Sequence, residues 1–167
     1  MNDSNFEPAV EYLKILEGGY ANDPRDSGGE TKYGISAASN PGIDIKNLTW
    51  EGAKKIYKAK YWDAPKLGLI DDCRIVCRVF EQCVVGGQRV GVRLLQCAYN
   101  DLTHSGTLAP DGLMGPKTAN AINSYPHKDA LYAAINKQAA NRYPTLKNWN
   151  FYADSWMRRL GIEPPKR

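Results

Sequence analysis

Apolar residues recur at helical spacing along most of this chain, and glycine or proline interrupts each run. The runs predict a short helix opened by Pro116 and longer helices over about residues 8–17, 50–61, 72–85, 88–100, 127–143 and 148–160. Two of them end at a pair of glycines, Gly18-Gly19 and Gly86-Gly87, which stop helices. A chain patterned in this way is expected to fold as a mainly helical protein.

Residues 20–36 break the helical pattern. They are rich in Asn, Asp, Gly and Pro, with Tyr, Thr and Ile between them, which predicts an irregular loop, a turn at Gly28-Gly29 and a short β-hairpin. The 167 residues and 43% apolar content suffice for one compact domain or two small lobes. The predicted class is therefore mainly α (α+β), with one small β-hairpin.

Charge and hydropathy exclude several classes of protein. The net charge is +4 and Lys and Arg are scattered, whereas a nucleic-acid binder gathers them on one face, so no nucleic acid is expected as partner. A mild positive charge suits an anionic polymer. The sequence contains no run of about 18 apolar residues, so no insertion into a membrane is predicted. Residues 1–5 lack the basic and apolar regions of a secretory signal, so we expect synthesis in the cytoplasm without a signal peptide.

The four cysteines do not form a recognisable metal site. Cys73 and Cys77 lie one helical turn apart, and neither His104 nor His127 stands at ligand spacing from them. Buried, reduced cysteines behave as small apolar residues. We therefore expect core cysteines, no metal and no cofactor.

Glu17 ends the apolar face of the first predicted helix, which Phe6, Val10 and Leu13 form at spacings of four, three and four. A carboxyl group there is partly desolvated and faces the negative end of the helix dipole, and both effects favour its protonated form. Glycoside hydrolysis needs a carboxylic acid that can still donate a proton near neutral pH. The alternative is a surface carboxylate at a frayed helix end.

Two further polar residues follow Glu17 at short range. Asp26 lies nine positions later in a loop that can fold back, and Thr31 lies five positions after Asp26 in the predicted hairpin. Together with Glu17 they would surround one cleft. The alternative interpretations are a turn-forming aspartate at Asp26, a strand-edge charge at Glu30 and a cross-strand hydroxyl at Thr31.

The stretch from Glu17 to Ser36, EGGYANDPRDSGGETKYGIS, resembles the signature of glycoside hydrolase family 108, the N-acetylmuramidases. The resemblance implies a lysozyme-like helical fold and cleavage of the β-1,4 bond between N-acetylmuramic acid and N-acetylglucosamine in bacterial peptidoglycan. It also implies that Glu17 is the proton donor. By analogy with phage-type lysozymes, it further implies that Asp26 and Thr31 hold the attacking water.

The resemblance continues downstream. Tyr61-Trp62-Asp63 is similar to a Y-W-D element of the family, and Asp111 through Asn123 resembles a peptidoglycan-binding segment that commonly follows. This implies a muramidase catalytic segment over residues 1–95 and a peptidoglycan-binding-like helical segment over 96–167, packed as one compact unit. The chain departs from the pattern in one place, where Glu81 and Val85 stand near an expected Asp and Asn.

Aromatic and charged side chains are the candidates for holding the substrate. Aromatic faces can stack on sugar rings, and arginine can bind carboxylates of the peptide stems. We predict that Trp50, Tyr57 and Phe80 are core residues. The predicted substrate-binding residues are Tyr20, Glu30, Tyr33, Trp62, Trp149 and Arg158.

We also expect a monomer that acts in the periplasm or on the cell wall after its release. Other functions stay open at this point. One is a non-catalytic peptidoglycan-binding module, although pure binding needs no acid with a raised pKa. Another is a lytic transglycosylase, which also uses one glutamate but forms an anhydro sugar. A third is action on a different polysaccharide, such as chitin.

Overall fold

The computed structural model describes residues 3–16, 29–146 and 149–161. Within these ranges the chain is mainly helical and contains one two-stranded antiparallel sheet, so the predicted α+β class is confirmed. The α-helices are α1 (Phe6–Leu16), α2 (Trp50–Tyr57), α3 (Cys73–Gly86), α4 (Gln88–Thr103), α5 (Pro116–Ser124), α6 (Lys128–Arg142) and α7 (Trp149–Gly161). The shorter elements are a π-helix, η1 (Lys58–Asp63), two 3-10 helices, η2 (Leu67–Leu69) and η3 (Tyr143–Thr145), and the strands β1 (Thr31–Lys32) and β2 (Ile35–Ser36).

The predicted short hairpin is present, and it turns at Tyr33-Gly34. Gly28 of the predicted Gly28-Gly29 turn lies outside the described residues. Thr31 pairs with Ser36 and Lys32 pairs with Ile35, which leaves two residues for the turn. Both turn residues have positive φ, 52° for Tyr33 and 75° for Gly34, as a type I′ hairpin turn requires.

Polar side chains fix the starts of two helices. The Thr49 hydroxyl accepts a hydrogen bond from the Gly52 backbone at 3.1 Å, and an Asp72 carboxylate oxygen accepts one from the Ile75 backbone at 2.9 Å. These N-caps satisfy backbone N–H groups that have no partner inside the helix. They set the starts of α2 and α3 close to the predicted positions.

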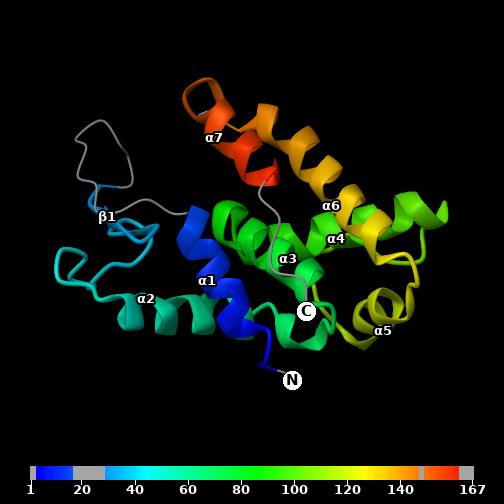
Figure 1. Ribbon diagram of the computed structural model, residues 1–167, viewed down its shortest axis with the longest axis horizontal. Helices are drawn as coiled ribbons and strands as arrows, with labels where there is room; N and C mark the ends of the chain where they lie inside the picture. Colours follow the sequence, from blue (N-terminus) through cyan, green and yellow to red (C-terminus); the bar gives the residue numbers. More distant parts are fainter. Residues whose placement is uncertain (1–2, 17–28, 147–148, 162–167) are drawn as a thin grey trace.

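Helix α3 is the central element of the fold. It packs on α1, α4 and α6, and Figure 1 shows it between α1 and the long α4–α6 pair. The sequence predicted one buried side for this helix, formed by Ile75, Val76, Val79, Phe80 and Cys83, and all five are buried. The polar side is buried as well, including Arg78, Glu81 and Gln82. Helix α3 is therefore covered by the rest of the protein on both its apolar and its polar side.

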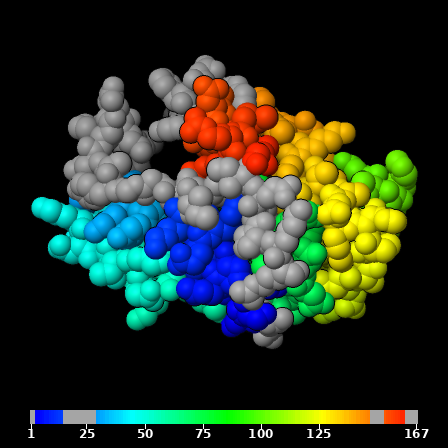
Figure 2. Space-filling view, viewed as in Figure 1, coloured from blue at the N-terminus to red at the C-terminus, as the bar shows by residue number. Residues whose placement is uncertain are grey.

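The main core extends over both predicted segments. It includes side chains from Ala9 in α1 to Ile135 in α6, and the proposed boundary between residues 95 and 96 falls inside α4. A smaller apolar cluster of Leu94, Ala139 and Tyr143 is covered by α7. Figure 2 shows α1 in blue, α6 in orange and yellow, and α7 in red at the surface of one face. Among the described residues, no helix has the length and apolar character needed to cross a bilayer.

The close approach of α3 and α4 depends on Gly91. A Cβ atom at this position would lie 2.2 Å from the Val79 carbonyl oxygen and 2.6 Å from the Cys83 sulfur. We expect Gly91→Ala to lower the free energy of unfolding by about 1–3 kcal/mol, because the clash outweighs the better helix propensity of alanine. Urea unfolding measures this change. Gly106→Ala is the matched control, since a Cβ there meets no heavy atom within 4 Å. Equal stability of the two variants would contradict the packing described here.

Candidate active site

Along the sequence, the predicted catalytic residues fall between the end of α1 and the first strand of the hairpin. Glu17, Tyr20 and Asp26 are outside the described residues. The structure describes the two elements that flank them, α1 and the β1–β2 hairpin. The surroundings of the candidate site are therefore described from α1 and the β1–β2 hairpin.

Tyr33 is held firmly at the hairpin turn. Its backbone carbonyl accepts a hydrogen bond from the Tyr57 hydroxyl, and its ring packs edge-on against Trp50 with centroids 5.5 Å apart. The ammonium group of Lys32 lies 5.6 Å from the Tyr33 ring centroid. The ring remains partly exposed. A fixed, partly exposed aromatic ring has the properties of a sugar-stacking residue.

Trp50 joins the hairpin to α1. Its indole N–H donates to a Glu11 carboxylate oxygen at 3.0 Å, and the Lys14 ammonium lies 5.0 Å from the ring centroid. The prediction of a core residue was only partly right, because Trp50 packs against the core but stays partly exposed. Through Trp50, the hairpin turn is fixed beside the last turns of α1.

Glu30 and Thr31 lie on the same hairpin as Tyr33. The Thr31 hydroxyl donates to the Gly29 carbonyl at 3.3 Å, and the Glu30 carbonyl accepts from the Ala37 backbone N–H at 2.9 Å. Both side chains are partly exposed. The structure therefore brings three of the predicted site residues, Glu30, Thr31 and Tyr33, onto one hairpin beside α1.

Trp62 does not belong to this group. Its indole is 0% exposed and lies edge-on to Phe6 and Phe80, with ring centroids 5.4 and 5.8 Å away. The indole N–H donates to an Asp3 carboxylate oxygen at 3.1 Å. A ring that stacks on sugar needs an open face, so the prediction of Trp62 as a substrate-binding residue was wrong. Trp62 is a core residue between α1 and α3, carried there by η1.

Helix α7 carries the last two predicted substrate-binding residues. The side chain of Trp149 is outside what the structure describes. Arg158 is exposed in the last turn of α7, while the neighbouring Arg159 is partly buried and points toward Glu81. Arg158 is thus accessible to a substrate.

A buried polar network beneath α7 was not predicted from the sequence. We call it the Arg78 network. Its members come from α3, α6, η3 and α7, and they are Arg78, Glu81, Gln82, Tyr132, Tyr143 and Arg159. The Arg78 guanidinium lies 3.4 Å from a Glu81 carboxylate oxygen and donates to the Tyr132 hydroxyl at 2.8 Å. Gln82 donates to the same Glu81 oxygen at 2.6 Å and to the Tyr143 hydroxyl at 2.7 Å.

The Arg78 network attaches α7 to the core. Arg78 donates to the Arg159 carbonyl at 3.2 Å and to the Leu160 carbonyl at 3.5 Å. These carbonyls are at the C-terminal end of α7, where a cation is stabilised by the helix dipole. Burial raises the pKa of the Glu81 carboxyl above its ordinary range, although Arg78 acts against this change. Because Glu81 is fully buried, it does not contact a substrate in this conformation.

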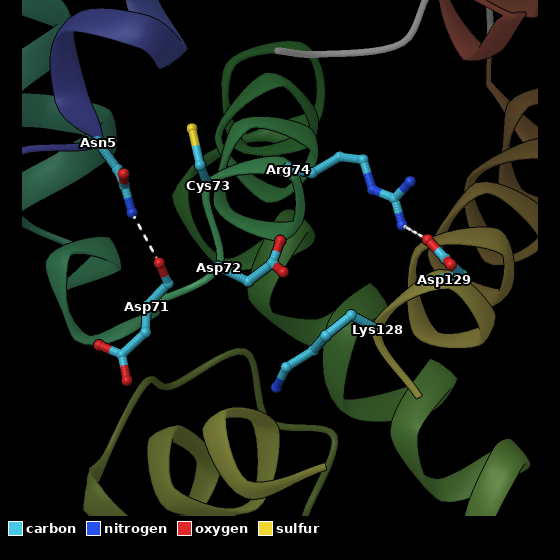
Figure 3. A pocket seen from close by; sticks show the side chains of 7 residues that line it. All are labelled: Asn5, Asp71, Asp72, Cys73, Arg74, Lys128 and Asp129. Atoms are coloured by element: carbon cyan, nitrogen blue, oxygen red, sulfur yellow. Dashed lines mark hydrogen bonds and ion pairs between the residues drawn. The ribbon is translucent and has the colours of Figure 1, made fainter. Parts of the chain in front are cut away.

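A polar pocket of about 400 Å³ opens where the starts of α1, α3 and α6 meet (Figure 3). Seven residues line it: Asn5, Asp71, Asp72, Cys73, Arg74, Lys128 and Asp129. Arg74 is paired with Asp129, and the Lys128 ammonium donates to the Ile122 and Asn123 carbonyls at 2.5 and 2.9 Å. Asp72 caps α3. Arg74 and Lys128 are thus already paired with other groups of the protein. The polar side chains of this pocket therefore stabilise the contacts between helix ends.

The four cysteines are free thiols. The sulfur atoms of Cys73 and Cys77 are 3.9 Å apart, and no group of three or more potential metal ligands occurs among the described residues. Cys73, Cys77 and Cys83 are buried, whereas Cys97 is partly exposed. Burial raises the pKa of the Cys83 thiol to about 12, which makes it unreactive near neutral pH.

These differences predict a simple labelling pattern. We expect a thiol reagent such as a maleimide to modify Cys97 in the native protein, and all four cysteines after denaturation, because the thiolate must be accessible to react. Mass spectrometry of the labelled protein counts the modified thiols. Rapid native labelling at Cys73, Cys77 or Cys83 would contradict the burial described here.

Comparison with known proteins assigns the first part of the chain to the glycosyl hydrolases. Residues 10–87 match the family described as Glycosyl hydrolase 108, and this segment is a domain of that family. The match begins inside α1, includes the Glu17–Ser36 motif, and ends just after α3. The predicted family is therefore confirmed for this segment. The resemblance of the C-terminal part to a peptidoglycan-binding segment stays a prediction.

The fold of the whole chain is similar to a solved structure described as "Structure of Brucella abortus SagA". The two chains superpose with a TM-score of 0.80 at 22% sequence identity, and the match covers 95% of this chain and 91% of the other. The similarity includes both halves of the chain. None of the curated proteins compared matches the sequence.

Proposed function

We propose that this protein is a peptidoglycan hydrolase of the N-acetylmuramidase type. It would cleave the β-1,4 bond between N-acetylmuramic acid and N-acetylglucosamine. The observation that carries the proposal is the position of the Glu17–Ser36 motif, which lies wholly inside the glycosyl hydrolase 108 domain. The catalytic acid and the bond specificity are inferred from that motif.

Glu17 is the proposed general acid. Val10 and Leu13, which precede it on the same predicted helix face, are fully buried. A carboxyl group that continues this face at the C-terminal end of a helix has its pKa raised by desolvation and by the helix dipole. It can therefore donate a proton to the leaving glycosidic oxygen as the C–O bond breaks.

Asp26 and Thr31 are proposed to hold the attacking water. Tyr33 is proposed to stack on a sugar ring, since the hairpin fixes its ring while leaving part of it exposed. Tyr20, Glu30, Trp149 and Arg158 complete the proposed substrate contacts. The action would take place in the periplasm or on the cell wall after release of the protein.

Product analysis tests the proposal. The purified protein is incubated with purified peptidoglycan, and the products are separated and analysed by mass spectrometry. A muramidase releases fragments with N-acetylmuramic acid at the new reducing end. Anhydro products, lighter by one water, would show a lytic transglycosylase instead, and binding without any release would show a non-catalytic module. Cleavage of chitin but not of peptidoglycan would indicate a different substrate.

A further inference from the structure

A second pocket of about 400 Å³ lies between α4 and α6, and we call it the α4–α6 pocket. Its lining residues are Val90, Arg93, Leu94 and Cys97 of α4, and Gln138, Asn141 and Arg142 of α6. It differs from the pocket in Figure 3 in its balance of charge. The α4–α6 pocket is lined by two cations and no carboxylate, so its charge is not neutralised from within.

Arg142 is the unusual member of this lining. Its Nη1 atom is buried and has no hydrogen-bond partner, and no carboxylate among the described residues forms an ion pair with it. The guanidinium lies against the α3–α4 junction, where a Cβ at Gly86 would be 3.1 Å from Nη2. Arg142 as a whole is partly exposed, so the side chain can be reached from the pocket. A buried guanidinium N–H without a partner costs free energy, which an anion bound in the pocket would recover.

The rest of the lining is suited to an organic anion. Arg93 is exposed and adds a second positive charge to the lining. The amide group of Asn141 can donate hydrogen bonds. Asp101, one turn beyond Cys97 on α4, already accepts a hydrogen bond from Gln138 at 2.5 Å. Val90 and Leu94 supply an apolar wall. A carboxylate with a small apolar group next to it matches this combination.

We propose that the α4–α6 pocket binds a carboxylate of the peptide stem of peptidoglycan. The inference rests on the proposed function and names a contact to the same substrate. Arg142 and Arg93 would bind the carboxylate, because the planar guanidinium forms paired hydrogen bonds with it. Val90 and Leu94 would contact the neighbouring alanine methyl group. The stem carries such carboxylates and methyl groups, whereas an N-acetylglucosamine chain carries no charge for two arginines to meet.

Binding measured without cleavage tests this inference. In a Glu17→Gln background, affinity is measured for muramyl dipeptide, which carries a short stem, and for a chito-oligosaccharide, which has none. We expect Arg142→Gln and Arg93→Gln each to weaken muramyl dipeptide binding about tenfold, and to leave chito-oligosaccharide binding unchanged. Lys137→Gln is the control, since it removes the same charge from an exposed position of α6 outside the pocket.

The outcomes separate the two proposals. Equal muramyl dipeptide binding by the parent, Arg142→Gln and Arg93→Gln would overturn the stem-binding inference, as would an equal loss in Lys137→Gln or no binding by the parent. If Arg142→Gln alters the melting temperature, the exposed Arg93→Gln variant decides the outcome. If the unmutated protein cuts no glycan while arginine-dependent stem binding is present, the proposed hydrolase function fails and the stem site stands.

Discussion

Replacing Glu17 by glutamine is expected to reduce the rate of peptidoglycan cleavage by about 10²–10⁴-fold while the protein stays folded. The amide has almost the same shape as the carboxylic acid but cannot donate the proton that the leaving oxygen needs. Release of new reducing ends measures the rate, and circular dichroism with thermal unfolding checks the fold. The effect should fall on kcat, because the proton is needed in the transition state.

Glu7→Gln is the matched control for this experiment. Glu7 is an exposed carboxylate on α1, the helix that precedes Glu17 in the sequence, and it is paired with Lys54 at 2.9 Å on the surface. Its replacement should change activity little. A well-folded Glu17→Gln protein that retains near-normal cleavage would remove Glu17 from the mechanism, and an equal loss in Glu7→Gln would point to a general effect on α1.

The sequence pattern predicted the helices and the buried face of α1 well. Val10 and Leu13 recur at helical spacing, and both side chains are fully buried. Helical spacing says which residues share a face, but it does not say how deep each one lies. For this reason the depth of two tryptophans was predicted incorrectly. Trp62, predicted to bind substrate, is fully buried, and Trp50, predicted to be in the core, is partly exposed. The π-helical turn that carries Trp62 has no clear signal in the sequence.

The Arg78 network could not be predicted from the spacing of residues. Charged residues are mostly exposed, so Arg78 and Glu81 on α3 would ordinarily be assigned to solvent. Their burial depends on Tyr132 and on the end of α7, which are 54 or more positions away from Arg78. The local motif around Glu17, by contrast, is continuous in sequence. A catalytic site can therefore be proposed from this motif alone, whereas the supporting contacts needed the tertiary structure.

The same reasoning applies to the α4–α6 pocket. Arg142 follows an ordinary helical pattern, and nothing in the sequence indicates that its Nη1 atom is buried without a partner. The pocket exists only because α6 packs along α4. Residues of α4 and α6 that line one pocket can be identified from the structure. They are far apart in the sequence, so the sequence alone does not show that they lie together.

Breaking the Arg78 network should have the largest effect on stability. Arg78→Met removes the cation from Glu81 and from the C-terminal carbonyls of α7, and we expect it to lower the free energy of unfolding by about 3–5 kcal/mol. The double variant Arg78→Met/Glu81→Leu should recover part of this loss, because no unpaired charge is then left buried. Urea unfolding at neutral pH measures both. Arg89→Met, at an exposed position of α4, should stay within about 0.5 kcal/mol of the parent.

The loss in Arg78→Met should also depend on pH, with a definite sign. Burial raises the folded-state pKa of Glu81 above its ordinary value of 4.5, and Arg78 acts to lower it. Below pH 4.5 the carboxyl is protonated in both the folded and the unfolded state, so it needs no cation and the loss should be small. As the pH rises above this value, the Glu81 carboxyl ionises first in the unfolded chain. In the folded variant the same carboxyl must either keep its proton or become a buried anion without Arg78 beside it. The deficit relative to the parent should therefore grow from acid to neutral pH. A deficit that is the same at both pH values would mean that Arg78 stabilises the fold through packing and the α7 carbonyls, and not through the charge of Glu81.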